Sequence, residues 1–326
     1  MNRADLLELL DEARRAPSVH NTQPARWRDI GHGKLELCAD RDRWLKIADP
    51  NRHDLRLSLG AAYEGMAIAL AHRGYRVSPP ELLVEDQGVA RLTFESGGEP
   101  DPLGFAVARR AAYRGSFVPT RREVLDQLEV ALNPHAVQVV RSREHLQALA
   151  KLADRAAAQF LLEPGYWRET WEWLRLDPSH PGWSRDGLNA DALALTPIER
   201  QLGRTLMRPG PFEAMCRLGL AGLLISERSK VESAAALLLF TARSGEDPFE
   251  TGRAFYRRWL QVTAAGLALC PMSALADSKS ANQEVREMFS LPEDRRLVNV
   301  FRIGATPPGF TARLTPRLPA EELLVV

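Results

Sequence analysis

One short pattern occurs twice in this chain, each time at the start of a helix-like segment. Gly60–Tyr63 (Gly-Ala-Ala-Tyr) opens a segment that closes at Gly74, and Gly252–Phe255 (Gly-Arg-Ala-Phe) opens another that closes at Gly266 over the same distance. A fixed spacing shared by two distant segments is typical of an internal repeat. The pattern therefore favours a chain built from two related halves. The alternative is a chance match, because Ala-rich amphipathic helices resemble one another.

The charge balance and the length of the apolar runs exclude two classes of protein. The 326 residues include 43 Lys plus Arg and 42 Asp plus Glu, so the formal net charge is +1. A nucleic-acid-binding protein usually shows a basic excess or a basic patch. No apolar run approaches the ~20 residues of a membrane-spanning helix; the longest, Leu218–Ile225 and Ala234–Phe240, are predicted to be buried helices. We therefore expect neither nucleic acid nor membrane as a partner.

The N-terminus and the cysteines indicate the cellular compartment and whether disulfides or a zinc site are expected. The first ten residues carry early acidic side chains and no apolar signal region, which predicts a cytoplasmic protein. Cys38, Cys216 and Cys270 are too few and too scattered for a disulfide framework or a zinc site, so no metal is expected.

Apolar periodicity predicts a mixture of helices and strands. Residues 163–187 are rich in Trp, Pro and Gly and show no periodicity. An irregular stretch of this length is typical of a lid or binding loop. Helix-like patterns continue from Pro197 to Ala242. The other predicted helices cover 2–15, 57–73, 103–110, 121–132, 144–162 and 249–267, and the predicted strands cover 34–38, 89–95, 136–140 and 297–303.

The familiar catalytic motifs are absent. The sequence has no GxSxG elbow, no HExxH, no phosphate-binding Walker loop and no GxGxxG after a strand. This argues against a metal hydrolase or a triad hydrolase. A cofactor enzyme is still compatible, because the cofactor then supplies the reactive atoms and the chain supplies binding and orientation.

Two segments combine groups that could hold a ligand. Pro17–Pro24 places hydroxyl, amide and imidazole groups between two prolines, although these side chains could instead satisfy the backbone of an ordinary turn. Arg109–Phe117 carries several guanidinium groups, which suit phosphate oxygens. The alternative for this second segment is a solvated basic face.

Two further segments follow the second repeat helix. In Cys270–Ala274 the proline forces an extended entry, which leaves backbone amides at Met272, Ser273 and Ala274 able to face a ligand. An ordinary loop between helices is the alternative. In the tail, Arg317 lies between prolines where no helix can form, so it is able to reach back to another element.

Taken in order, these segments resemble the nitroreductase superfamily of FMN-binding flavoproteins, from about residue 10 to residue 320. Residues 16–24 resemble the family's Ala-Pro-Ser-x-x-Asn-x-Gln-Pro-Trp motif, and Arg110–Phe117 is similar to its Arg-Arg-Ser-x-Arg-x-Phe motif. Residues 270–274 resemble the loop along the flavin N5 edge. More narrowly, the chain resembles the Acg-like branch, in which two nitroreductase-like halves are fused.

The resemblance implies a role for each matching residue. Arg110, Arg114 and Arg317 would hold the FMN phosphate, with Ala112 in the same motif. The flavin and ribityl chain would lie along a second group of residues, and the isoalloxazine would face a third. These two groups are Pro17, Ser18, Val19 and Asn21, and Pro271, Met272, Ser273 and Ala274. No side chain is expected to be catalytic, because flavin N5 would carry the chemistry.

Three positions depart from the family pattern. Ala25 replaces the Trp that ends the loop motif, with Trp27 two positions later. Ala112 replaces a hydroxyl residue, and Ser273 stands where many members carry an acid. These departures affect the expected substrate more than the expected FMN site.

The resemblance also implies a fold and a division of the chain. The expected class is α+β, with two fused halves forming an internal pseudo-dimer whose antiparallel-rich sheets are flanked by helices. The halves would be 1–100 and 101–326, with a lid insertion in 163–230 that includes Trp167, Trp171, Trp173 and Trp183; core filling is the alternative role for these tryptophans. One composite FMN site would lie between the halves, and the chain would be a monomer or a weak homodimer.

The activity implied by the resemblance is transfer of hydride from NAD(P)H through flavin N5 to a nitroaromatic, quinone or similar small acceptor. Two alternatives stay open at this point. One is an FMN-binding or sequestering protein whose lid prevents turnover, and the other is a biosynthetic flavin-dependent dehydrogenase for a specific small molecule.

Overall fold

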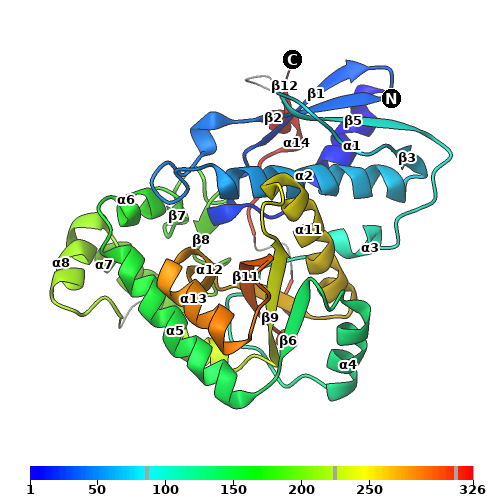
Figure 1. Ribbon diagram of the computed structural model, residues 1–326. Coiled ribbons are helices and arrows are strands. Elements are labelled where there is room, and N and C mark those ends of the chain that lie inside the picture. Colours follow the sequence, from blue (N-terminus) through cyan, green and yellow to red (C-terminus); the bar gives the residue numbers. More distant parts are fainter. Residues whose placement is uncertain (85–87, 223–225, 312–314, 326) are drawn as a thin grey trace.

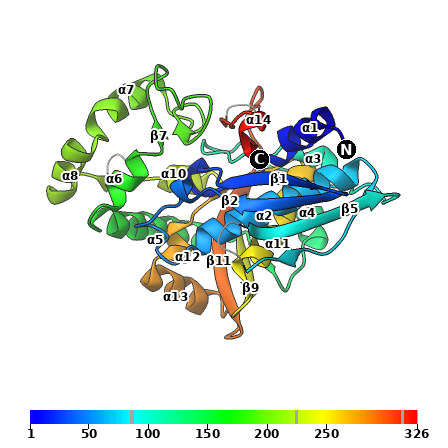
Figure 2. The same ribbon diagram turned by 90° about the horizontal axis from the view of Figure 1, so that it is seen from above.

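A computed structural model describes residues 1–326 except 85–87, 223–225, 312–314 and 326. Helices and strands alternate along the chain, and two sheets lie on opposite sides of a pair of long helices (Figures 1 and 2). The α+β class predicted from the sequence is confirmed. No helix in the described ranges is long and apolar enough to cross a membrane.

The first sheet contains the N-terminal strands and the extreme C-terminal strand. Its order is β12-β1-β2-β5-β3, with β4 also paired to β5. All pairs are antiparallel except β1 with β12, which are parallel. The strands are β1 (Ala25–Gly31), β2 (Lys34–Ala39), β3 (Tyr75–Val77), β4 (Glu81–Leu82), β5 (Gly88–Ser96) and β12 (Leu324–Val325). The C-terminal tail therefore returns to the sheet formed by the beginning of the chain.

Two long helices lie at the centre of the molecule and pack against each other. α2 (His53–His72) is buried continuously from Ser58 to Leu70, because the first sheet and α1 (Arg3–Ala13) cover one side and α11 (Pro248–Ala264) covers the other (Figure 1). These are the two helices that carry the repeated Gly-x-Ala-aromatic pattern. Small residues in the repeat permit the two backbones to approach closely.

The second sheet has the order β10-β11-β9-β6 and is antiparallel throughout. One face packs against α5, α12 and α13, and the other against α4 and α11. The strands are β6 (Val137–Val140), β9 (Ala236–Arg243), β10 (Ala268–Pro271) and β11 (Arg295–Gly304). The helices are α4 (Arg122–Ala131), α5 (Arg143–Leu161), α12 (Ala274–Asp277) and α13 (Lys279–Met288).

The helix predicted for Ala234–Phe240 is wrong, because this run forms most of β9. Leu237 and Leu239 pack with α5 and α13, whereas Leu238 and Phe240 pack with α4 and α11. A strand covered by helices on both faces is apolar at every position, so it lacks the alternation that identifies a half-buried strand.

Residues 163–230 form a separate group of short elements, at the left in Figure 1. They comprise α6 (Tyr166–Trp171), β7 (Leu174–Arg175), β8 (Leu188–Asn189), α7 (Pro197–Leu206) and α8 (Pro209–Arg217). The next helix, α10 (Arg228–Glu232), packs instead with α5, because its Val231 lies in the core of the second sheet. A small core of their own holds the elements from α6 to α8 together, in which Trp167 stacks on Phe212 with ring centroids 4.0 Å apart. The buried helix predicted for Leu218–Ile225 is not observed: Leu218 is 73% exposed, and residues 223–225 lie outside the described ranges.

Four short elements complete the described structure, one of which is η2 (Arg41–Arg43) between β2 and α2. η1 (Val19–Asn21) lies within the polar loop that follows α1, and α3 (Gly104–Val107) precedes the arginine segment. α14 (Ala320–Leu323) leads into β12. The segments that contain η1 and α14 bring the polar loop and the tail together beside α2.

Candidate cofactor site

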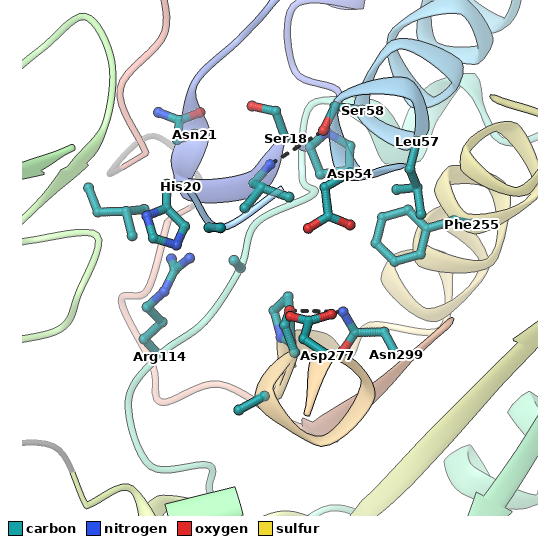
Figure 3. Close-up of a pocket in the computed structure, with 18 of the residues that line it drawn as sticks. Ser18, His20, Asn21, Asp54, Leu57, Ser58, Arg114, Phe255, Asp277 and Asn299 are labelled. Carbon is teal, nitrogen blue, oxygen red and sulfur yellow. Dashed lines mark hydrogen bonds between the residues drawn. The ribbon is translucent and has the colours of Figure 1, made fainter. Parts of the chain in front are cut away.

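A cavity of about 400 Å³ lies where the polar loop, the arginine segment, the tail and the ends of α2, α5 and α12 meet (Figure 3). The predicted site residues converge on it from distant parts of the sequence. Those that line the cavity are Pro17, Ser18, Val19, Asn21, Arg110, Ala112, Arg114, Pro271, Ser273, Ala274 and Arg317.

Met272 differs from the others. Its side chain is buried in the core beneath the second sheet, and it does not line the cavity. Its backbone N–H donates to the carbonyl of Val300 at 2.7 Å, because β10 continues its pairing with β11 for one more residue. The expectation that this amide faces a ligand is therefore wrong. In the described ranges, by contrast, the amides of Ser273 and Ala274 donate to no backbone carbonyl.

The polar loop holds an unusual backbone conformation. His20, Asn21 and Gln23 have φ values of 47°, 56° and 53°, in the left-handed region that costs free energy for residues other than glycine. Local hydrogen bonds stabilise this shape: the amide of Gln23 donates to Ser18 Oγ at 2.9 Å, and Asn21 Nδ2 donates to the carbonyl of Pro316 at 2.9 Å. Hydrogen bonds within the chain therefore hold the loop in this conformation.

Two guanidinium groups lie at one end of the cavity, that of Arg110, which is buried, and that of Arg317, which is half-buried. Arg110 is only 4% exposed, and its Nε has no partner in the described part of the chain. Its guanidinium carbon lies 4.8 Å from the ring centroid of Trp259. Burial, with the nearby charges of Arg15 and Arg114, lowers the pKa of Arg110 to about 10.

Arg317 reaches the same end of the cavity from the tail. It donates to Asn21 Oδ1 at 2.6 Å and to the carbonyl of Arg15 at 3.3 Å, while its Nε is also unpartnered in the described ranges. Burial and the charge of Arg110 hold its pKa well below the usual value. No ion pair to a carboxylate is formed by Arg110, Arg114 or Arg317 among the described residues. A buried and a half-buried cation without a counter-ion form a site for an anion.

Arg114 lies further along the wall and faces His20 (Figure 3). It donates only a long hydrogen bond, 3.4 Å, to the carbonyl of Ala192. Burial and the charge of Arg114 lower the pKa of His20 to about 4, so the imidazole is neutral at pH 7. The positive charge at this end of the cavity therefore comes from arginines alone.

The opposite part of the cavity is lined by two carboxyl groups that the sequence did not indicate. Asp54, in the first turn of α2, and Asp277, the last residue of α12, face each other (Figure 3). Burial and the nearby Asp49 raise the pKa of Asp54 to about 6. Burial and the negative charges of Asp54 and Asp49 raise the pKa of Asp277 well above its usual value.

Aromatic rings form the walls between these two ends. Phe255 and Trp259 come from successive turns of α11, and Tyr166 from α6 stacks on Phe160 from α5 with centroids 5.2 Å apart. None of Trp167, Trp171, Trp173 and Trp183 lines the cavity; within the described residues its lining from 163–230 is Tyr166 and Leu188. Trp167 belongs to the core of 163–230, which is the role of core filling considered above.

Hydrogen bonds tie 163–230 to the first part of the chain over the cavity. The carboxylate of Glu169 accepts from the amides of Ile47 at 3.0 Å and Ala48 at 2.8 Å. Asn21 and Gly187 exchange two bonds: Asn21 Nδ2 donates to the Gly187 carbonyl at 2.9 Å, and the Gly187 amide donates to the Asn21 carbonyl at 3.2 Å. The polar loop is therefore in contact with both the tail and 163–230.

No cluster of three metal-binding side chains occurs among the residues that the structure describes. The cavity lining combines arginines at one end, flat apolar walls and polar groups at defined points, a composition that suits an organic ligand.

Comparison with known proteins gives one short match to a named enzyme and one long match to a protein without an assigned function. No family model matches the chain. A putative NAD(P)H nitroreductase of Mycobacterium tuberculosis is 44% identical over 68 residues, which are 21% of this chain and 20% of that protein. The chain thus matches about one fifth of the length of that relative. An uncharacterized protein of M. tuberculosis is 25% identical over 336 residues, covering 96% of this chain and 90% of its own.

Among solved structures, two FMN-dependent nitroreductases named NfnB align with the chain. The enzyme from Mycobacterium smegmatis, in complex with NADPH, is 20% identical, covers 64% of this chain and 88% of its own, and has a TM-score of 0.36. The enzyme from Sphigopyxis sp. strain HMH is 18% identical, covers 69% and 99%, and has a TM-score of 0.38.

The named M. tuberculosis relative carries the name of the enzyme family that the motifs of this chain resemble. It does not distinguish the Acg-like branch from others, so that placement stays a prediction. The sequence similarity to a protein named as a nitroreductase is thus limited to 68 residues of this chain.

Proposed function

We propose that this chain is an FMN-dependent NAD(P)H oxidoreductase whose cofactor binds in the cavity described above. The observation that carries the proposal is the pair Arg110 and Arg317. Arg110 is buried, Arg317 is half-buried, and each has a buried, unpartnered Nε in the described ranges. Burial lowers the pKa of both groups, and the charge of Arg110 lowers the pKa of Arg317 further. A phosphate dianion would satisfy both donors and remove the repulsion.

The other lining residues suit the remainder of FMN. Pro17, Ser18, Val19 and Asn21 would lie along the flavin and ribityl chain, on a loop already fixed by hydrogen bonds. Bound FMN supplies a two-electron carrier between a reduced nicotinamide and an acceptor.

The residues after β10 would face the isoalloxazine. Pro271, Ser273 and Ala274 line the cavity, and Ala112 lies beside them because it forms a bridge with Leu269 of β10. The free amides of Ser273 and Ala274 would donate to the atoms where negative charge develops on reduction. Met272 would support this loop by packing beneath it.

The reductant and the acceptor class follow from the relatives by analogy. The M. smegmatis structure contains NADPH and the short curated match is named an NAD(P)H nitroreductase, which supports a nicotinamide reductant here. We propose a nitroaromatic, quinone or similar small molecule as the acceptor, and a cytoplasmic setting.

The organisation of the chain follows the same proposal. The halves are 1–100 and 101–326, the lid lies in 163–230, and one composite site lies between the halves. The contact between α2 and α11 supports an internal pseudo-dimer, because it covers a surface that a homodimer would otherwise cover. We therefore propose a monomer.

A second function is favoured by the hydrogen bonds over the cavity. Glu169, Asn21 and Gly187 hold 163–230 closed. If these bonds persist after FMN binds, the chain is an FMN-binding protein with little turnover. Anaerobic reduction by NADPH separates the two functions.

The phosphate assignment is tested by comparing FMN with riboflavin, which lacks the phosphate. Flavin-free protein is titrated with each, and quenching of flavin fluorescence is measured. We expect FMN to bind more tightly by a factor on the order of 10² or more, because two charge-assisted donors are gained. The double variant Arg110→Ala, Arg317→Ala is expected to bind both flavins equally. A wild-type chain that binds riboflavin as tightly as FMN would overturn the assignment.

A further inference from the structure

Arg302 of β11 carries a fully buried guanidinium group that the proposed FMN site does not use. It is 0% exposed, and it does not line the cavity. Its Nη1 donates to the carbonyl of Gly115 at 2.7 Å, whereas its Nε and Nη2 have no partner in the described part of the chain. The side-chain hydrogen bond that Arg302 makes therefore goes to the arginine segment, Arg109–Phe117.

No negative charge neutralises this group within the described ranges. Arg302 forms no ion pair with a carboxylate there. Cys270 is its partner across β10 and β11, and burial raises the pKa of that thiol, so Cys270 is uncharged at neutral pH. An apolar side chain of similar volume would fill the same space without the loss of hydration that a buried charge suffers. What distinguishes an arginine from an apolar residue here is its contact with the arginine segment.

The end of the arginine segment runs from β10 to the end of β11. The amide of Tyr113 donates to the carbonyl of Leu269 in β10 at 2.8 Å. The amide of Val118 donates at 3.0 Å to the carbonyl of the residue that follows β11. Arg302 contacts the stretch between these two attachments, through the carbonyl of Gly115. It therefore fixes the middle of this stretch.

The ring of Phe117 lies over the same guanidinium group. Its centroid is 5.3 Å from the guanidinium carbon of Arg302, which is within the range of a cation–π interaction. The close approach of this ring to β11 leaves no room for a side chain at Gly304, where a Cβ atom would lie 2.6 Å from a ring carbon of Phe117. Arg302 thus contacts the arginine segment at two places, a backbone carbonyl and an aromatic ring.

Arg114 depends on this support because few other contacts hold its side chain. It faces His20 in the cavity (Figure 3), and its hydrogen bond to the carbonyl of Ala192 is long, 3.4 Å. The position of its guanidinium group is therefore set mainly by the backbone from which it extends. Arg302 holds that backbone at the next residue, Gly115.

We propose that Arg302 is a positioning residue for the anion site: by holding Gly115 it keeps Arg114 directed at the cavity, and it thereby raises the affinity for a phosphate group. The inference rests on the proposed function, since it takes this phosphate to be that of FMN. A charge-assisted hydrogen bond weakens steeply when donor and acceptor are displaced or misaligned. Because Arg302 does not line the cavity, it acts on the ligand only through the arginine segment.

The test measures the Kd of riboflavin divided by the Kd of FMN, a ratio that reports the phosphate contact, by fluorescence titration of flavin-free protein. Arg302→Met is expected to lower this ratio about fivefold and to leave the Kd of riboflavin unchanged. Arg302→Lys keeps a charged donor for the carbonyl, so it is expected to recover part of the ratio. Arg295→Met is the matched control: this arginine lies at the other end of β11 and donates to the carbonyl of Thr241 at 2.8 Å. It is expected to keep the wild-type ratio.

A double-mutant cycle with Arg114→Ala separates positioning from a merely structural role. If Arg302 acts through Arg114, Arg302→Met lowers the ratio in the wild-type background and has no further effect in the Arg114→Ala background. A merely structural role would weaken the binding of both flavins in the same proportion. Thermal unfolding shows whether each variant is folded, and the same cycle with Arg302→Lys gives the answer if the methionine variant is not.

The outcomes distinguish this inference from the FMN assignment. A wild-type ratio in Arg302→Met, or an equal fall in the presence and absence of the Arg114 side chain, would overturn the inference and leave the FMN assignment in place. Equal binding of FMN and riboflavin by the wild-type chain would instead contradict the proposed function, and the inference with it.

Discussion

Gly60 of α2 and Gly252 of α11 make reciprocal contacts with each other's helices. A Cβ atom on Gly60 would lie 1.9 Å from the carbonyl oxygen of Phe249, and one on Gly252 would lie 2.0 Å from the carbonyl oxygen of Leu57. Each carbonyl belongs to the residue three positions before the opposite glycine. This exchange is the relation expected of two elements related by a twofold axis, so it supports the proposed internal pseudo-dimer.

Replacement of either glycine by alanine is expected to destabilise the protein by about 1–3 kcal/mol, because the added methyl group meets backbone rather than a flexible side chain. The free energy of unfolding is measured in urea. Gly210→Ala is the matched control: it also lies in a helix, and its Cβ would meet nothing within 4 Å. That variant is expected to be unchanged or slightly more stable. Similar losses in all three variants would contradict the close contact.

Arg110→Met is expected to affect the flavin-free and the FMN-loaded protein in opposite ways. Without FMN, it removes a buried charge that lacks a counter-ion, so stability should be unchanged or higher by about 1 kcal/mol. With FMN, the increase in melting temperature caused by the cofactor should be largely lost. Arg109→Met, at the exposed neighbour, should leave both values unchanged. Destabilisation of the flavin-free Arg110 variant would indicate a structural role for this guanidinium.

Because of Asp54, the free energy of unfolding is expected to fall as the pH rises from about 4 to about 6. Burial and Asp49 raise its pKa to about 6 in the folded state, so the folded protein binds this proton more tightly than the unfolded chain. The stabilisation is therefore fully present at low pH and is lost as the pH passes through 6, by about 1–2 kcal/mol after solvent screening. Urea unfolding of Asp54→Asn should show a shallower fall than the wild type across this range.

Much of the fold could be predicted from the sequence because helical periodicity is strong in this chain. The predicted helix 144–162 corresponds to α5 (Arg143–Leu161), and 121–132 corresponds to α4 (Arg122–Ala131). The prediction of a helix for Ala234–Phe240 failed, because periodicity cannot distinguish a strand buried on both faces from a buried helix.

The arginine and loop segments of the site were identifiable from their polar composition and their order. The acidic part of the cavity, which consists of Asp54 and Asp277, could not be identified in this way. Asp54 in a first helical turn is what the helix dipole alone would favour, and nothing near Asp277 in the sequence marks it as special. The two groups become unusual only because the fold brings them together across a cavity.

Glu169→Gln is expected to loosen 163–230 over the cavity. The glutamine loses the negative charge and one of the acceptor oxygens that bind the amides of Ile47 and Ala48. Bound FMN should therefore dissociate several-fold faster, as measured by the fluorescence of released flavin. Glu172→Gln, an exposed change at the end of the same helix, serves as the control. Equal dissociation rates in the wild type and in Glu169→Gln would show that these bonds do not hold the lid.

The most direct test of the proposed function is the absorbance spectrum of the purified protein, followed under anaerobic conditions after addition of NADPH and then NADH. We expect flavin bands in the oxidised protein that bleach with at least one of the two nucleotides. Bands that persist with both would favour the FMN-binding alternative. A protein that shows no flavin bands, even after incubation with FMN, would contradict the assignment of the Arg110 and Arg317 cavity to this cofactor.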